Sequence, residues 1–322
     1  MVDDALIANA AAVLKAGGLV GLPTETVYGL AADASNSQAI AKIYSAKGRP
    51  SDHPVIVHLA HVDQIKDWAT DIPEAAWILA RAFWPGPMTL ILKRAPHVLD
   101  AVTGGQDTVG LRVPSHPVAH AVLAAFDGGV AAPSANKFGR VSPTTAQHVR
   151  DEFGNAIDLV LDGGASEVGI ESTIIDCSGS GQRVLRPGAI TETMIADALG
   201  DTARSKPVAK TQTPRVSGSL DAHYAPHTRL MLLAPAAVPA ALATQDHGRV
   251  AVLSRVRPTG FAGQWRQASA DAHAYARELY AHLRELDGVG ADLLLIEAPS
   301  QGMEWDGIND RLRRAAFGSG EE

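Results

Sequence analysis

The residues DDALIANAAAVLKAGGLVGL, positions 3–22, contain a change of periodicity from which the fold class follows. From position 3 to position 15 the apolar side chains recur at helical spacing, and the pair Gly17–Gly18 ends the helix. Leu19 to Leu22 follow as a short apolar run, which predicts a buried strand. A helix that leads directly into a buried strand is the unit from which α/β folds are built.

The same alternation continues along the chain and predicts an α/β domain. Short apolar runs between turn-forming residues indicate the strands, and apolar residues at helical spacing indicate the helices. The last two predicted strands form a hairpin across residues 178–181. We expect helices at 37–47 and 74–83, and strands at 55–59, 88–92, 109–113, 130–132, 159–161, 172–176 and 183–185.

The composition changes near Thr202. Residues 202–228, TARSKPVAKTQTPRVSGSLDAHYAPHT, are polar, contain three prolines and lack a regular period, which is typical of a linker. Strands expected at 229–233, 250–253 and 293–297 and helices at 238–243 and 272–286 then predict a second α/β unit. The organisation we expect is a twisted open-sheet α/β domain at 1–203, a linker or lid at 204–228, a smaller Rossmann-like α/β domain at 229–318 and a tail at 319–322.

Composition limits the class of protein without naming a substrate. A length of 322 residues favours two domains, and 46% hydrophobic with 20% charged residues can bury a core. The net charge of −7 gives no general attraction to phosphate backbones, so a nucleic-acid contact would need a local basic patch. One cysteine, an acidic start and the lack of a run of roughly 20 apolar residues predict a cytoplasmic protein without a membrane span.

Two segments near the start of the first domain have the character of a ligand site. The segment GLPTETVYGL, residues 21–30, places polar side chains directly after a buried strand, although it is also compatible with a strand-to-helix loop whose threonines cap backbone donors. In KGRP, Lys47 and Arg49 suit a polyanionic ligand, since lysine supplies a point charge and arginine a rigid fork. A solvated pair of charges at the end of a helix is the alternative.

Arg112 lies within the apolar strand of TVGLRVP, residues 108–114. Burying an unpaired charge costs roughly several kcal/mol. If Arg112 is buried in this strand, it therefore needs an anionic partner. That partner is either an internal carboxylate or the carboxylate of a ligand, and the sequence leaves both open.

The remaining motifs supply hydroxyls, an amide and an arginine next to strands: PSAN at 133–136, SPT at 142–144, IEST at 170–173 and LRPG at 185–188. His116 and His120 are four residues apart, but Pro117 and the lack of a further ligand motif make zinc a poor interpretation, so we assign no protein-bound metal site. The usual phosphate loop, dinucleotide fingerprint and nucleophile elbow are missing from the sequence. Cys177 directly follows an apolar strand, which favours a structural role.

Taken in order, PTETVYGL, KGRP, HPVIVHL, GLRVP, PSAN, IEST and LRPG closely resemble the YrdC/Sua5 family of L-threonylcarbamoyladenylate synthases. The linker and the second α/β unit resemble the long Sua5 form. The resemblance implies a twisted α/β domain with a positively charged cavity for ATP and L-threonine. It also implies the reaction of L-threonine, bicarbonate or CO₂ and ATP to threonylcarbamoyl-AMP and pyrophosphate, for the N6-threonylcarbamoyladenosine modification of tRNA position 37.

The resemblance assigns roles motif by motif. Lys47 and Arg49 take the catalytic positions, with Lys47 expected to hold phosphate or the carbamate. L-Threonine contacts are implied for Thr26, His58, Arg112, Ala132 and Ser172. ATP contacts are implied for Arg49, His53, Thr108, Ser134, Asn136, Ser142, Arg186 and Tyr224.

Within the linker, residues 217–226 resemble the Sua5 pattern SPGxxxxHYxP, with the spacing from Gly218 to His223–Tyr224 preserved. Ser217 replaces the usual proline of that pattern. By resemblance we expect Tyr224 to cover the nucleotide as a lid. The alternative is a linker merely pinned to the first domain.

The resemblance also implies cofactors and partners. Mg²⁺ is expected to arrive with ATP, held mostly by phosphates and water, with no tightly bound organic cofactor. The product would pass to the tRNA threonylcarbamoyl transferase complex, and weak RNA binding is a further expectation. Two other functions remain open from the sequence: a carbamoyl-adenylate-forming enzyme like the module of hydrogenase maturation proteins, and a nonenzymatic double-stranded RNA-binding protein.

Overall fold

The structure is a computed structural model that describes residues 3–200, 213–218 and 220–320. The chain divides into two compact units, which are described separately. The first contains residues 1–138 and 143–219, and the second contains residues 139–142 and 220–322. Of the linker expected at 204–228, residues 204–212 and 219 lie outside the described residues.

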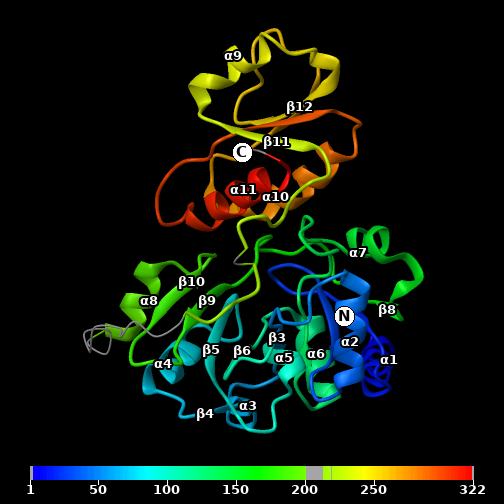
Figure 1. Cartoon of the computed structure of the whole chain (residues 1–322), viewed down its shortest axis with the longest axis vertical. Helices are drawn as coiled ribbons and strands as arrows, with labels where there is room; N and C mark the ends of the chain where they lie inside the picture. Colours follow the sequence, from blue (N-terminus) through cyan, green and yellow to red (C-terminus); the bar gives the residue numbers. More distant parts are fainter. Residues whose placement is uncertain (1–2, 201–212, 219, 321–322) are drawn as a thin grey trace. The chain divides into compact units, whose positions relative to one another are not determined.

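A mixed sheet organises the first unit (Figure 1). Its described strands number ten, in the order β10-β9-β5-β6-β3-β7-β2-β1-β8, with β4 paired to β5. Parallel pairs join β9 to β5, β6 to β3 and β1 to β8, and the other pairs are antiparallel. The strands are β1 Val20–Leu22, β2 Gly29–Asp33, β3 Ile56–His58, β4 Ala69–Thr70, β5 Met88–Arg94, β6 Thr108–Arg112, β7 Val130–Ala131, β8 Leu159–Val160, β9 Thr173–Asp176 and β10 Arg183–Arg186.

Helices cover one sheet face and part of the other. The larger apolar core joins residues of α2, α4, α7 and α8 to the sheet. On the opposite face, α1 and α6 pack against β1, β2 and β7, which leaves the β3, β6, β5 and β9 part of that face outside this second core. The helices of this unit are α1 Asp4–Lys15, α2 Ser37–Lys47, α3 Ile65–Trp68, α4 Glu74–Phe83, α5 Asp100–Thr103, α6 Pro117–Phe126, α7 Ala146–Phe153 and α8 Glu192–Leu199.

The second unit is a smaller α/β layer structure, as expected. Its described strands form an all-parallel sheet in the order β11-β14-β12-β13, whose core includes Val250, Val252 and Leu295. The first residue of the expected tail, Ser319, accepts a hydrogen bond from the Leu230 N–H and is therefore held by this unit. The elements are β11 Arg229–Leu233, α9 Val238–Leu242, β12 Val250–Ser254, β13 Gln264–Gln267, α10 Ala272–Asp287, β14 Leu293–Glu297 and α11 Asp306–Gly318.

The fold class predicted from the sequence is confirmed, and the predicted hairpin is the antiparallel pair β9–β10. One alternative that the sequence left open is wrong. Residues 21–30 do not form a strand-to-helix loop, because β2 follows and pairs antiparallel with β1. The polar segment therefore connects two neighbouring strands. The capping role proposed for its threonines is present, since Thr24 Oγ1 accepts from the N–H groups of Thr26 and Val27, each at 3.3 Å.

Candidate active site

The part of the sheet face that lies outside the second core carries polar residues that the sequence singled out. The register pairs His58 of β3 with Arg112 of β6, so these two side chains point to the same side. Their neighbours Val57 and Leu111 point to the opposite side and belong to the larger core. We call the side that carries His58 and Arg112 on β3, β6, β5 and β9 the site face.

Arg112 is buried on the site face, and its partner is an internal carboxylate. Its Nη2 donates to Glu25 Oε1 at 2.6 Å, its Nη1 to Thr26 Oγ1 at 2.8 Å and its Nε to Gly86 O at 3.2 Å. The second oxygen of Glu25 accepts from the Ser115 N–H at 3.2 Å. The need for an anionic partner is thus confirmed. Because these contacts use three of the five N–H groups of arginine, further donors remain for a ligand carboxylate.

Thr26 lies between Arg112 and a second hydroxyl. Since Thr24 Oγ1 donates to Val27 O at 2.5 Å, it accepts from Thr26 Oγ1, which is 2.9 Å away. Thr26 Oγ1 in turn accepts from Arg112. This chain of hydrogen bonds fixes the direction of the Thr26 hydroxyl within a buried loop.

His58 stays uncharged at neutral pH. Burial, with a further contribution from the charge of Arg112, lowers the pKa of His58 from 6.5 to about 3. Its Nδ1 lies 3.3 Å from Ile56 O, which can only accept. Nδ1 therefore carries the proton, and Nε2 is an acceptor beside a cation.

Ser172 and Arg186 form a second cluster next to the strand β9. Ser172 Oγ lies 2.8 Å from Thr89 Oγ1 of β5. Arg186 donates from Nε and Nη2 to Ser172 O, at 3.1 and 2.9 Å, and from Nη2 to Ser172 Oγ at 3.1 Å. An expected threonine contact and an expected ATP contact therefore lie within hydrogen-bonding distance of each other.

Lys47 is buried, so the solvated alternative for KGRP is wrong. It is the last residue of α2, which ends because Gly48 takes the left-handed conformation at φ 63°. Lys47 Nζ donates to Ser134 O at 2.6 Å and to Asn136 O at 2.5 Å. Burial, followed by the charge of Arg49, holds the pKa of Lys47 well below its usual 10.5. The lysine thus holds the PSAN loop through two of its backbone carbonyl groups.

Arg49 lies two residues after Lys47 and contacts Ser217, in the described part of the linker. Its Nη2 donates to Pro54 O at 2.8 Å and to Ser217 Oγ at 3.1 Å. Ser217 O also accepts from Arg186 Nη1 at 2.9 Å. Two arginines that the resemblance assigns to ATP therefore meet at one linker residue.

Other expected contacts lie close to these. Ser134 and Asn136 belong to the loop that Lys47 holds, and the backbone N–H of Ala132 donates to Ile56 O at 3.0 Å. The His53 ring meets the Phe138 ring edge-on with 5.4 Å between centroids. Burial and the charge of Arg49 lower the pKa of His53.

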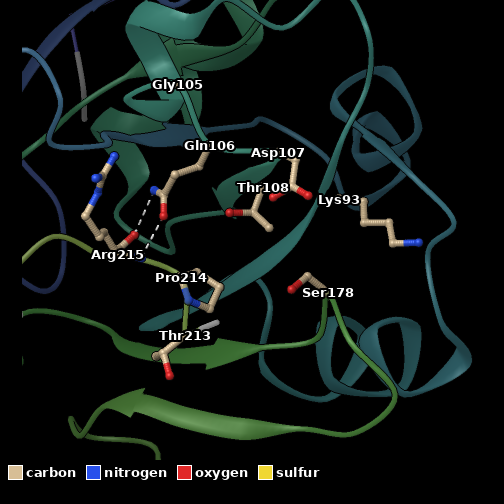
Figure 2. Close-up of a pocket in the computed structure, with 9 residues that line it drawn as sticks. All are labelled: Lys93, Gly105, Gln106, Asp107, Thr108, Ser178, Thr213, Pro214 and Arg215. Atoms are coloured by element: carbon tan, nitrogen blue, oxygen red, sulfur yellow. Dashed lines mark hydrogen bonds between the residues drawn. The ribbon is translucent and has the colours of Figure 1, made fainter. Parts of the chain in front are cut away.

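Thr108 lies at the opposite end of β6 from Arg112 and lines a pocket of ≈ 650 Å³ (Figure 2). The pocket wall includes the linker residue Arg215, which Figure 2 shows joined to Gln106 by two hydrogen bonds, of 2.7 and 3.1 Å. The lining residues are Lys93, Gly105, Gln106, Asp107, Thr108, Ser178, Thr213, Pro214 and Arg215.

Ser142 and Tyr224 belong to the second unit, where both are buried. Tyr224 takes a positive φ of 61° and stacks on Tyr280 with 5.9 Å between ring centroids. The Arg311 guanidinium lies 5.3 Å from the centroid of the Tyr224 ring. Ser142 O accepts from Arg284 Nε at 3.4 Å.

Sequence reasoning missed Glu25, although the residue lies inside the first motif. The signal was only partial, because a buried arginine needs an anionic partner and one of the quoted motifs, PTETVYGL, contains a carboxylate. Cys177 is buried in the core, where burial raises the pKa of its thiol to about 12, and its structural interpretation is confirmed.

Within the described ranges, His, Cys, Asp and Glu side chains form no group of three or more suited to a metal ion. The described helices are all too short or too polar to cross a bilayer.

Known families match both parts of the chain. Residues 12–188 match the Sua5/YciO/YrdC family model, described as telomere recombination, and residues 190–317 match the model described as the C-terminal domain of threonylcarbamoyl-AMP synthase. A threonylcarbamoyl-AMP synthase of Bacillus subtilis is 38% identical over 98% of this chain and 94% of its own length. One from Schizosaccharomyces pombe is 36% identical over 92% of this chain and 84% of its own length.

Solved structures give the same result. The crystal structure of Pyrococcus abyssi Sua5 complexed with L-threonine matches with a TM-score of 0.88 and 33% identity, over 99% of this chain and 96% of that chain. Since family models cover both units and relatives align along nearly the whole length, the chain belongs to the Sua5/YciO/YrdC family, in the long form that carries the threonylcarbamoyl-AMP synthase C-terminal domain.

Proposed function

We propose that this chain forms threonylcarbamoyl-AMP and pyrophosphate from L-threonine, bicarbonate or CO₂ and ATP, for modification of tRNA to N6-threonylcarbamoyladenosine at position 37. The observation that carries the proposal is the pairing of a buried cation, Arg112, with a neutral acceptor, His58, on neighbouring strands. A carboxylate and an amine on one small molecule fit such a pair. Membership in this family identifies the small molecule as the amino acid L-threonine.

For L-threonine, the carboxylate would bind the remaining N–H groups of Arg112. The neutral His58 Nε2 would accept a hydrogen bond from the amine, which must lose a proton before it can react. The hydroxyls of Thr26 and Ser172 would face the substrate hydroxyl, and the backbone at Ala132 would complete this side. A site that hydrogen-bonds the substrate hydroxyl discriminates strongly against analogues that lack it.

For ATP, Arg49 and Arg186 would bind phosphate oxygens, since arginine grips phosphate with paired donors. Lys47 would hold phosphate or the carbamate after a shift of its ammonium from the PSAN loop. The other contacts proposed are His53, Thr108, Ser134, Asn136, Ser142 and Tyr224. Mg²⁺ would enter with ATP and keep mostly phosphate and water ligands.

The reaction then proceeds in two steps. The amine nitrogen attacks the carbon of CO₂ and gives its proton to water or bicarbonate, which leaves a carbamate. A carbamate oxygen next attacks the α-phosphorus, and the bond to the bridging oxygen breaks as pyrophosphate leaves. Positioning and stabilisation of phosphate charge are the main tasks of the protein.

Beyond the reaction, we propose a cytoplasmic enzyme, because its single cysteine is buried and unpaired with another cysteine. The adenylate would pass to a tRNA threonylcarbamoyl transferase complex. Any contact with RNA would be weak, given a net charge of −7.

The test is direct. Protein, ATP, Mg²⁺, bicarbonate and L-threonine are incubated together, and threonylcarbamoyl-AMP is sought by mass spectrometry. Release of pyrophosphate that depends on L-threonine is the expected result. Release that depends on carbamoyl phosphate instead, or salt-sensitive RNA binding without ATP turnover, would replace the proposal with one of the two other functions.

A further inference from the structure

We propose that Ser217 is a positioning residue for ATP, whose hydroxyl and carbonyl hold Arg49 and Arg186 at a common point beside the site face. Arg49 Nη2 donates to Ser217 Oγ at 3.1 Å, and Arg186 Nη1 donates to Ser217 O at 2.9 Å. The inference rests on the proposed function, because it takes both arginines as phosphate contacts. It adds a linker residue to the machinery that binds the nucleotide.

Ser217 can serve as a fixed point because its own segment is anchored to the first unit. The backbone of Arg215 exchanges two hydrogen bonds with the Gln106 amide, and Arg215 Nη2 donates to Gly104 O at 2.9 Å. Val216 packs with Ile91 and Ile174 in an apolar cluster on the site face. The hydrogen bonds of Arg215 and the burial of Val216 therefore fix the position of the backbone at Ser217.

Each arginine is also held from a second direction. Arg49 Nη2 reaches Pro54 O at 2.8 Å, and Arg186 reaches Ser172 O through Nε and Nη2. A free arginine side chain carries about 2 kcal/mol of rotamer entropy, so fixing it before the ligand arrives strengthens binding. The acceptors named here are carbonyl and hydroxyl oxygens, and contacts of this kind orient a guanidinium.

The hydroxyl of Ser217 is specific to this chain relative to the Sua5 linker pattern, which has proline at this position. Proline retains the carbonyl that Arg186 uses but has no side-chain acceptor for Arg49. The contact from Arg49 to Ser217 Oγ is therefore the part of the arrangement that substitution can remove selectively.

The experiment compares Ser217→Ala, which removes the hydroxyl, with Ser217→Thr, which keeps it. ATP binding without L-threonine is measured by calorimetric titration, and KM for ATP and for L-threonine are measured separately in the adenylate assay. The matched control is Ser35→Ala, which removes the hydroxyl of an exposed serine. Circular dichroism checks that each variant is folded.

For Ser217→Ala we expect roughly 3- to 10-fold weaker ATP binding and a matching rise in KM for ATP, which is the size of effect typical of losing one ordinary hydrogen bond. KM for L-threonine should stay within about two-fold, and Ser217→Thr and Ser35→Ala should behave like the wild type.

Wild-type ATP affinity in Ser217→Ala would overturn the proposal, and so would an equal loss in Ser217→Thr, which would point to packing rather than to the hydroxyl. If the wild type binds ATP but forms no adenylate, the proposed function fails, while the titration still decides the role of Ser217.

Discussion

Glu25 and Arg112 form a buried ion pair, with 2.6 Å between Oε1 and Nη2 and only 5% of each side chain exposed. The free energy of removing two charges from water can exceed the free energy of their attraction, so a buried ion pair is weak evidence for stability. Its effect is to orient the arginine, because Nη2 is fixed by Glu25 while Nη1 is fixed by Thr26.

Removing one partner of this pair should destabilise the protein. For Glu25→Ala we expect the free energy of unfolding to fall by about 3 to 5 kcal/mol, since Arg112 is left as an uncompensated buried charge. Urea unfolding followed by circular dichroism measures the change. Glu74→Ala is the control, because the Glu74–Arg81 pair is 68% and 59% exposed, and it should cost less than about 1 kcal/mol. Equal losses in the two variants would contradict a buried, structurally coupled pair.

Arg112→Ala should weaken L-threonine binding more than ATP binding, because it removes the donors proposed for the substrate carboxylate. Charge-assisted hydrogen bonds of this kind are worth about 1.5 to 3 kcal/mol, which corresponds to roughly 10- to 100-fold in affinity. Titration of each ligand measures the asymmetry. The double variant Arg112→Ala with Glu25→Gln removes the orphaned carboxylate and should keep the threonine defect. Equal loss of both ligands in the folded double variant would count against the carboxylate role.

His58 should make the fold sensitive to acid. With a pKa of about 3 in the folded protein and 6.5 in the unfolded chain, the unfolded state binds more protons between these values. Stability is therefore lost as the pH falls from 6.5 toward 3. Between pH 7 and about pH 4.5, the wild type should lose about 2 to 3 kcal/mol more than His58→Gln. Urea unfolding measures this difference. If the wild type and His58→Gln lose the same free energy of unfolding over this pH range, His58 is not buried in its neutral form.

Arg49→Ala should reduce kcat/KM for ATP by roughly 10- to 100-fold, because it deletes a guanidinium proposed to bind phosphate. The adenylate assay under limiting ATP measures this value. Arg81→Ala, which removes an exposed arginine, is the control and should leave it unchanged. An unaltered kcat/KM in Arg49→Ala would remove Arg49 from the proposed site.

Tyr224→Ala should lower the yield of adenylate and raise futile ATP hydrolysis, if the ring covers the nucleotide and keeps water from the carbamate. In the second unit the ring packs against Tyr280 and Arg311, so Tyr224→Phe should retain most of the function. Both products are quantified in one reaction by chromatography. A wild-type ratio of adenylate to ADP or AMP in Tyr224→Ala would leave the linker with an anchoring role, as residues 215–217 already have on the first unit.

Local periodicity predicted much of the fold. The helices at 37–47 and 74–83 were predicted with both ends, and the sequence of the second half indicated three of the four described strands of its sheet. The helix α11 was missed, because its buried stripe includes Arg311, a charged residue with 0% exposure that interrupts the apolar period. The helix α6 was missed too, although Pro117 at its first turn is a favourable start.

The site was predicted less completely, for a physical reason. The sequence indicated that Arg112 needs an anion, but the choice of Glu25 depends on a loop that reaches β6 from 87 residues away. In the same way, the sequence around Lys47 is compatible with a solvated helix end. In the structure Lys47 is covered by the PSAN loop, whose contacting residues lie 87 and 89 positions later in the chain. Contacts of this range follow from the sheet topology and leave no local trace. The roles of these residues toward ligands stay predictions.

The register between β3 and β6 has a consequence for how this protein tolerates change in length. Successive side chains in a strand face opposite ways, so deleting one residue before His58 in β3, or before Arg112 in β6, would turn that side chain into the core. Insertions in the β9–β10 turn at residues 178–181 would leave this pairing untouched. Natural variation in length should therefore gather in such turns, while the spacing of residues 56–58 and 108–112 is fixed by the same pairing that builds the sheet.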